Sequence, residues 1–132
     1  MKTNEKVGNI MTKNVISIDA DDSLKIIDET FRKHKFHHIP VLEHGKLVGI
    51  ISKSDLLQLL SIRDQYTKAE FDKIKTRNIM TTKILTLEPD DHVGLAADIF
   101  TTNFFHCIPI TSDGVLVGIV TTHDLLKHAF SE

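Results

Sequence analysis

Two Ser/Thr-x-x-Asp sequences are the residues of this chain with the clearest capacity for chemistry. Ser52 and Asp55 form the first, Thr121 and Asp124 form the second, and each follows an apolar run. A carboxylate at a helix start can accept two hydrogen bonds from a vicinal ribose diol, and the unpaired N–H groups of the helix N-terminus suit a phosphate. The same spacing also caps a helix without binding anything. Whether the motif binds a ligand or only caps a helix therefore has to be judged from the helices and strands around it.

Both motifs belong to an internal repeat. Residues 9–57 align with residues 78–126 at an offset of 69 without a gap, and 19 of the 49 aligned residues are identical. The identical residues include paired glycines, prolines, histidines and aspartates, which chance similarity between amphipathic stretches does not produce. The chain therefore contains two structural copies, and two copies of any site.

Each copy predicts the order strand, helix, strand, strand, helix. In the first copy we expect a strand at 15–18, a helix from Leu24 capped by Asp22 or Ser23, strands at 39–42 and 47–52, and a helix at 56–62. The corresponding ranges in the second copy are 84–87, 93–102, 108–111, 115–121 and 125–130. Gly45 and Gly114 supply the hairpin turns. This pattern predicts an α/β (α+β) fold with two β-α-β-β-α copies packed about a pseudo-twofold axis.

The expected domain organisation is a first copy at residues 1–60, a helical linker at 61–77 and a second copy at 78–132. The linker contains neither Gly nor Pro, so we expect a helical extension followed by a short helix. Its apolar residues Tyr66, Phe71 and Ile74 should dock it on the body of the protein.

Composition narrows the class of protein. The 132 residues carry a net charge of −2, with 41% hydrophobic and 26% charged residues, which is ordinary for a soluble globular chain. A weakly acidic chain makes nucleic acid an unlikely partner, because phosphate binding usually needs an excess of basic residues. No apolar run approaches the roughly 20 residues of a membrane span, and the N-terminus has no signal-peptide core. With Cys107 as its one cysteine, the chain is expected to be cytoplasmic.

The repeat resembles the cystathionine-β-synthase (CBS) domain, which occurs as tandem pairs. The markers are an Ile-Met-Thr before the first strand, at 10–12 and 79–81, an Ile-Pro opening the second strand, and Gly-apolar-apolar-Ser/Thr-x-x-Asp at 49–55 and 118–124. The resemblance covers residues 7–130 and implies a regulatory, energy-sensing module of the Bateman type, here standing alone. It also implies a homodimer, and an adenosyl ligand in each of two clefts between the copies: AMP, ADP, ATP, S-adenosylmethionine or NAD, with Mg²⁺ accompanying ATP. No cofactor is required.

By this resemblance, each cleft draws on both copies. One cleft would set Thr12, Ile16 and the run Phe36, His37, His38, Ile39 and Pro40 against Thr121 and Asp124. The other would set Thr81, Leu85 and the run Phe105, His106, Cys107, Ile108 and Pro109 against Ser52 and Asp55. The clefts are not equivalent, because Ser54 in one copy corresponds to His123 in the other. A protonated His123 would favour phosphate, so we expect unequal affinities.

Metal binding and catalysis have little support. His34, His37 and His38 cluster in the sequence, but no Cys or second His pair completes a tetrahedral zinc set. The chain has no P-loop, nucleophile elbow or HExxH motif. His106 and Cys107 are adjacent in a strand, so their side chains point to opposite faces and cannot form a nucleophile–base pair.

The sequence therefore predicts a regulatory module that binds an adenosyl ligand and acts on a partner protein, and it does not predict an enzyme. The alternative is a ligand-free scaffold or dimerisation module that acts on its partner with unused clefts. The identity of the effector protein cannot be read from the residues.

Overall fold

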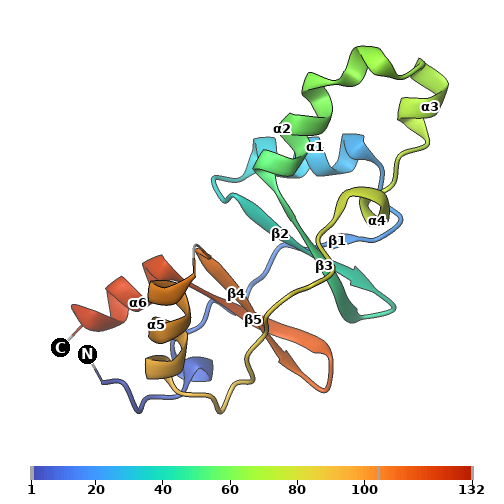
Figure 1. The fold of residues 1–132 in the computed structure, drawn as a ribbon. Helices are drawn as coiled ribbons and strands as arrows, with labels where there is room; N and C mark the ends of the chain where they lie inside the picture. Colours follow the sequence, from blue (N-terminus) through green and yellow to red (C-terminus); the bar gives the residue numbers. More distant parts are fainter. Residues whose placement is uncertain (1, 104, 132) are drawn as a thin grey trace. The chain divides into compact units, whose positions relative to one another are not determined.

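The structure is a computed structural model that describes residues 2–103 and 105–131. The chain forms two compact units that do not coincide with the sequence copies (Figure 1). The inner unit is Ile16–Ile84, and the terminal unit combines the residues up to Val15 with those from Leu85 onward.

The inner unit contains the helices and strands of the first sequence copy, followed by those of the segment up to Ile79. These are β1 (Ile18–Asp19), α1 (Leu24–Lys33), β2 (His38–Glu43), β3 (Lys46–Ser52), α2 (Lys53–Ser61), the 3-10 turn η2 (Arg63–Gln65), α3 (Lys68–Asp72) and α4 (Thr76–Ile79). Strand β1 runs parallel to β2, and β2 is antiparallel to β3. The core of this unit is built by Ile27, Ile39 and Ile51, all fully buried.

The terminal unit repeats this plan with the N-terminal segment added. Its elements are the 3-10 turn η1 (Val7–Asn9), α5 (Val93–Thr102), β4 (Cys107–Ser112), β5 (Val115–Thr121) and α6 (Thr122–Ala129). Strands β4 and β5 are antiparallel, and Leu87 forms a parallel bridge with Ile110. Its core is a separate cluster that includes Val7, Ile110 and Val120.

The predicted α/β class and the order of elements are confirmed, but several boundaries are wrong. The strand predicted at 15–18 is reduced to Ile18–Asp19, and the one predicted at 84–87 is reduced to the bridge at Leu87. The preceding residues connect the two units, and Ile16 is 40% exposed. The helix predicted at 56–62 begins at Lys53, because Ser52 is its N-cap.

Both hairpin turns follow the expected chemistry. Gly45 has φ 79° and Gly114 has φ 80°, and the residues before them, His44 and Asp113, both have φ 52°. Two consecutive residues with positive φ form the turn that matches the twist of an antiparallel pair.

The aspartates before the first helix of each copy cap turns rather than helices. Ser23 is the N-cap of α1 but makes no side-chain cap hydrogen bond. Instead, the Asp22 carboxylate accepts from the backbone N–H of Asp19 at 2.8 Å, and Asp91 accepts from Glu88 in the same way at 2.7 Å. The predicted capping role of Asp22 is therefore wrong, because the tight turn captures its carboxylate first.

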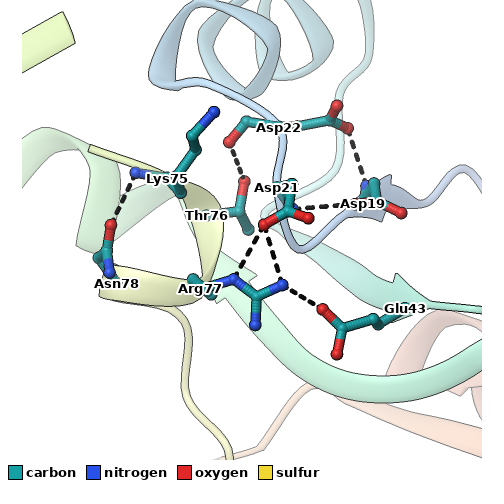
Figure 2. Close-up of polar contacts among 8 residues, drawn as sticks. All are labelled: Asp19, Asp21, Asp22, Glu43, Lys75, Thr76, Arg77 and Asn78. Carbon is teal, nitrogen blue, oxygen red and sulfur yellow. Dashed lines mark hydrogen bonds and ion pairs between the residues drawn. The ribbon is translucent and has the colours of Figure 1, made fainter. Parts of the chain in front are cut away.

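Residues 61–77 contain the turn η2 and the helix α3 and reach into α4, which is held against the rest of the inner unit (Figure 2). The Thr76 hydroxyl donates to the Asp22 carbonyl at 2.8 Å, and Arg77 forms ion pairs with Asp21 and Glu43. These hydrogen bonds, to Glu43 first and then to Asp21, raise the pKa of the Arg77 guanidinium.

The apolar residues of the linker dock as expected in two of three cases. Phe71 and Ile74 pack against the core of the inner unit. Tyr66 remains 38% exposed and contacts the Phe71 ring edge-on at 6.2 Å.

The Met-Thr segment that leads into each copy completes the unit built around the other copy. In the terminal unit, Thr12 forms a bridge with Ile119 of β5, and in the inner unit Thr81 forms one with Ile50 of β3. A glycine makes room for the methionine each time. A Cβ on Gly118 would lie 2.5 Å from the Met11 sulfur, and one on Gly49 would lie in the same way against Met80.

We expect Gly118→Ala to destabilise the protein by about 1–3 kcal/mol, the usual cost of overpacking. The added methyl would meet the Met11 sulfur and would also lie 3.0 Å from the Thr12 carbonyl oxygen, which belongs to the backbone. Urea denaturation of Gly118→Ala, Met11→Ala and the double variant measures the coupling between these residues. Strictly additive losses would show that the contact between Met11 and Gly118 does not determine the packing.

Candidate functional site

Each Ser/Thr-x-x-Asp motif forms a complete capping box. In the inner unit, the Ser52 hydroxyl accepts from the Asp55 N–H at 3.0 Å, and the Asp55 carboxylate accepts from the Ser52 N–H at 3.2 Å. In the terminal unit, Thr121 and Asp124 repeat these bonds at 3.1 and 2.9 Å. The capping interpretation is therefore confirmed. It does not exclude binding, because a carboxylate has about four acceptor positions and the cap uses one.

Thr12 adds a third side chain in the terminal unit. Its backbone pairs with Ile119 through hydrogen bonds of 2.8 and 2.9 Å. This pairing places the Thr12 hydroxyl 3.1 and 3.3 Å from the two Asp124 carboxylate oxygens. Residues 112 positions apart in the chain therefore form one polar cluster, made of Thr12, Thr121 and Asp124.

The inner unit has the same backbone arrangement without the third bond. Thr81 pairs with Ile50 at 3.0 and 2.9 Å. Among the residues that the structure describes, the Thr81 hydroxyl does not bond the Asp55 carboxylate as the Thr12 hydroxyl bonds that of Asp124. The two candidate sites differ already at their central carboxylates.

Beside each motif, the backbone carbonyl of a histidine accepts a hydrogen bond from the first residue of the following helix. The carbonyl of His37 accepts from the Lys53 N–H at 2.8 Å, and the carbonyl of His106 accepts from the Thr122 N–H at 3.2 Å. These bonds join the residue before each strand to the first turn of the following helix. Both histidine side chains are exposed.

Cys107 is half-buried and lies opposite Thr121 in the β4–β5 pair. Burial, and then the charge of Asp124, raise the pKa of its thiol to about 12. The thiol therefore stays protonated at neutral pH and is a poor nucleophile.

Several predicted site residues have side chains that belong to the cores. Ile39, Pro40, Ile108 and Pro109 are fully buried, so they have mainly backbone groups to offer a ligand. The Phe36 ring contacts the Phe31 ring edge-on, with 6.4 Å between ring centroids, and stacks on the His34 ring with 4.9 Å between centroids.

Other predicted site residues are accessible. Ile16, Leu85 and Phe105 are about 40% exposed (40, 41 and 42%). His123 is exposed and His38 is half-buried. Which residues of the inner unit face which residues of the terminal unit remains a prediction.

Sequence reasoning did not assign a role to the Met and Gly pairs that position the threonines. The signal was present, since Met11 and Met80 occupy equivalent repeat positions, as do Gly49 and Gly118. Their pairing was not visible, because each Met packs against the Gly of the other sequence copy.

Within residues 2–103 and 105–131, no three His, Cys, Asp or Glu side chains converge in a way that would hold a metal ion. No helix in those ranges is both long enough and apolar enough to cross a bilayer.

Comparison with known proteins identifies the family. The CBS domain model matches this chain twice, at residues 7–62 and 77–131. These ranges cover both copies together with the turn that precedes each one. The chain therefore belongs to the CBS domain family and carries two CBS domains.

Individual relatives agree with this assignment. MJ1426 of Methanocaldococcus jannaschii is 31% identical, over 92% of this chain and 89% of its own length. MJ1225 of the same organism is 27% identical over 95% of this chain, which spans only 47% of that relative. The crystal structure of MJ1225 superposes with a TM-score of 0.85, covering 98% of this chain and 49% of that one.

The structural neighbours include CBS domain pairs solved with ligands. The CBS domain pair of protein MJ0100 is 27% identical, has a TM-score of 0.79, and covers 96% of both chains. That structure is a complex with 5′-methylthioadenosine and S-adenosylmethionine.

Proposed function

We propose that this protein is a non-catalytic regulatory module that binds an adenosyl ligand at each Ser/Thr–Asp motif. The observation that carries the proposal is the capping box in both units, which holds the Asp carboxylate rigidly while leaving acceptor positions open. Binding of adenosyl compounds by the MJ0100 pair supports the ligand class.

The chemistry of each site follows from its groups. The Asp55 and Asp124 carboxylates accept hydrogen bonds from the ribose diol, which are strong because the acceptor is charged. Thr12, Ser52, Thr81 and Thr121 supply hydroxyl groups for the ribose or for a phosphate. The exposed apolar side chains Ile16 and Leu85 are suited to stacking on a base.

The ligand acts by linkage. It stabilises whichever conformation of the chain binds it more tightly, by the difference in binding free energy. Thr12 is a sensitive point, because its hydroxyl bonds Asp124 in the terminal unit while residues 13–15 connect it to the start of the inner unit. A ligand that displaces this hydroxyl would alter the connection. If the ligand is AMP, ADP or ATP, the module senses energy state.

A thermal-shift screen tests the ligand class directly. The panel is AMP, ADP, ATP, S-adenosylmethionine and NAD, each with and without Mg²⁺. A ligand at 100 times its Kd should stabilise the fold by about 2.7 kcal/mol, which is several degrees for a chain of this size. No shift at millimolar concentrations, on a sample folded by circular dichroism, would favour the ligand-free scaffold instead.

Conservative variants of the two aspartates test the site residues. Asp124→Asn and Asp55→Asn keep an oxygen for the helix cap but lose the charge, so each should weaken its own site by about 10–100-fold. Calorimetry on the wild type should show two unequal sites. His123 replaces Ser54, and among the described residues a threonine hydroxyl donates to the Asp124 carboxylate but not to that of Asp55.

Asp72→Asn on α3 is the matched control, since it removes an exposed carboxylate outside both motifs. Undiminished binding in both Asp124→Asn and Asp55→Asn would show that the ligand lies elsewhere. Two identical, independent sites in the wild type would contradict the expected inequality.

The proposed module is a homodimer that presents its helices to a second copy. Leu57 on α2 and Leu126 on α6 are equivalent in the repeat and are 55 and 58% exposed. Ile26 on α1 and Leu95 on α5 form a second equivalent pair, 39 and 45% exposed. A single exposed leucine is unremarkable, but recurrence at equivalent positions of both copies indicates a shared role.

We expect light scattering to give twice the chain mass of 14.9 kDa for the wild type, and a monomer for the double variant Leu57→Lys, Leu126→Lys. Val115→Lys is the control: Val115 is 42% exposed, lies in β5 rather than a helix, and corresponds to Lys46 in the other copy. A monomeric wild type, or a dimer that persists in the double variant, would contradict this interface.

A further inference from the structure

An open hollow of about 400 Å³ adjoins Asp124 in the terminal unit. It is lined by Glu5 and Asn9 of the N-terminal segment and by Lys127, His128 and Ser131 of the C-terminal segment. Asp124, Lys127 and His128 stand at positions i, i+3 and i+4 of α6, so they share one helix face. The hollow thus begins at the carboxylate proposed to bind ribose and continues along the helix.

The inner unit replaces three polar positions of this lining by apolar residues and keeps polar residues at Asp55, Gln58 and Asn78. Ile74 stands where the terminal unit has Glu5, and Leu59 stands where it has His128. Both pack against the core of the inner unit, together with Ile79, the equivalent of Ile10. The fold therefore does not need a pair of opposite charges here. The charges of Glu5 and Lys127 occur in the terminal unit and not at the equivalent positions, which points to binding rather than to stability.

The charges around the hollow are mixed, and some are already engaged. The Asn9 amide donates to the Glu5 carboxylate, and Asp124 accepts from Thr12 and Thr121. The His128 Nε2 lies 3.3 Å from the Lys2 carbonyl oxygen. Among the described residues, Lys127 forms no ion pair, and its side chain is exposed. The hollow is thus lined by the ammonium group of Lys127 and by the carboxylates of Glu5 and Asp124.

We propose that this hollow binds an α-amino-acid group, with Lys127 taking its carboxylate and Glu5 taking its ammonium. A phosphate would bring up to two negative charges beside Glu5 and Asp124 and would be repelled by both. A zwitterion matches the two signs. This inference rests on the proposed function, because Asp124 joins the hollow to the ribose position. The amino-acid group is the tail of an adenosyl ligand bound in the terminal unit.

Two neutral thioethers isolate the effect of the tail. 5′-Methylthioadenosine and S-adenosylhomocysteine share the adenosine and the sulfur, and only the second carries the amino-acid group. By calorimetry, we expect the wild type to bind S-adenosylhomocysteine at least 10-fold more tightly at one of its sites. Lys127→Gln, which introduces the residue of the equivalent position Gln58, should remove most of that advantage, and Glu5→Gln should do the same.

Affinity for 5′-methylthioadenosine should stay within two-fold in both variants, which excludes unfolding as the cause. Lys25→Gln, an exposed lysine on α1, controls for the loss of one positive charge and should change neither affinity.

The outcomes separate this inference from the proposed function. Equal affinities of the two thioethers in the wild type, or an advantage that survives both substitutions, would overturn the amino-acid site and leave adenosyl binding intact. Binding of free methionine that Lys127→Gln abolishes, with no advantage for S-adenosylhomocysteine, would show a separate amino-acid site and overturn the link to the adenosyl ligand. Failure of both thioethers and of AMP to bind would overturn the proposed function and this inference together.

Discussion

The close approach of a methionine to a glycine is the contact on which the candidate sites depend. Met11 lies against Gly118 and Met80 against Gly49, at distances that leave no room for a Cβ. This contact lets the following threonine pair with a strand, and in the terminal unit it brings Thr12 to Asp124. It also makes each compact unit from two separate pieces of the chain. A substitution in either Met-Thr segment therefore affects the packing of a unit built mainly from the other sequence copy.

The site reuses atoms that already stabilise the fold. The cap hydrogen bonds hold Asp55 and Asp124 in one rotamer, so little side-chain entropy is lost when a ligand binds. His37 and His106 also stabilise the fold beside the sites, because their backbone carbonyls accept hydrogen bonds that join the start of a strand to the start of a helix. Because the scaffold and the site share these groups, variants that keep the cap, such as Asp→Asn, test binding more cleanly than truncation does.

The two copies are most alike at the residues that position the threonine and the aspartate of each site. They differ in the residues next to these sites. Glu5, Lys127, His128 and Ser131 replace Ile74, Gln58, Leu59 and Ile62. An apolar contact of Leu59 and Ile74 in the inner unit is therefore replaced by charged and polar side chains that line a hollow in the terminal unit. Duplicated scaffolds with unequal linings can hold two different ligands, or one ligand with two affinities, without any change in the main chain.

The repeat, the order of elements, the hairpin turns at Gly45 and Gly114, and the two Ser/Thr–Asp motifs could all be predicted from the residues. They depend on local signals: hydrophobic periodicity, turn residues and capping spacing. The other features depend on contacts that form only when the chain folds. The strands at 15–18 and 84–87 shrank because those residues connect two units, and Asp22 capped a turn because its nearest unpaired N–H belonged to Asp19. The pairing of Met11 with Gly118 and the hollow beside Lys127 join residues more than 100 positions apart. Such contacts depend on which surfaces meet after folding, and no local pattern encodes them.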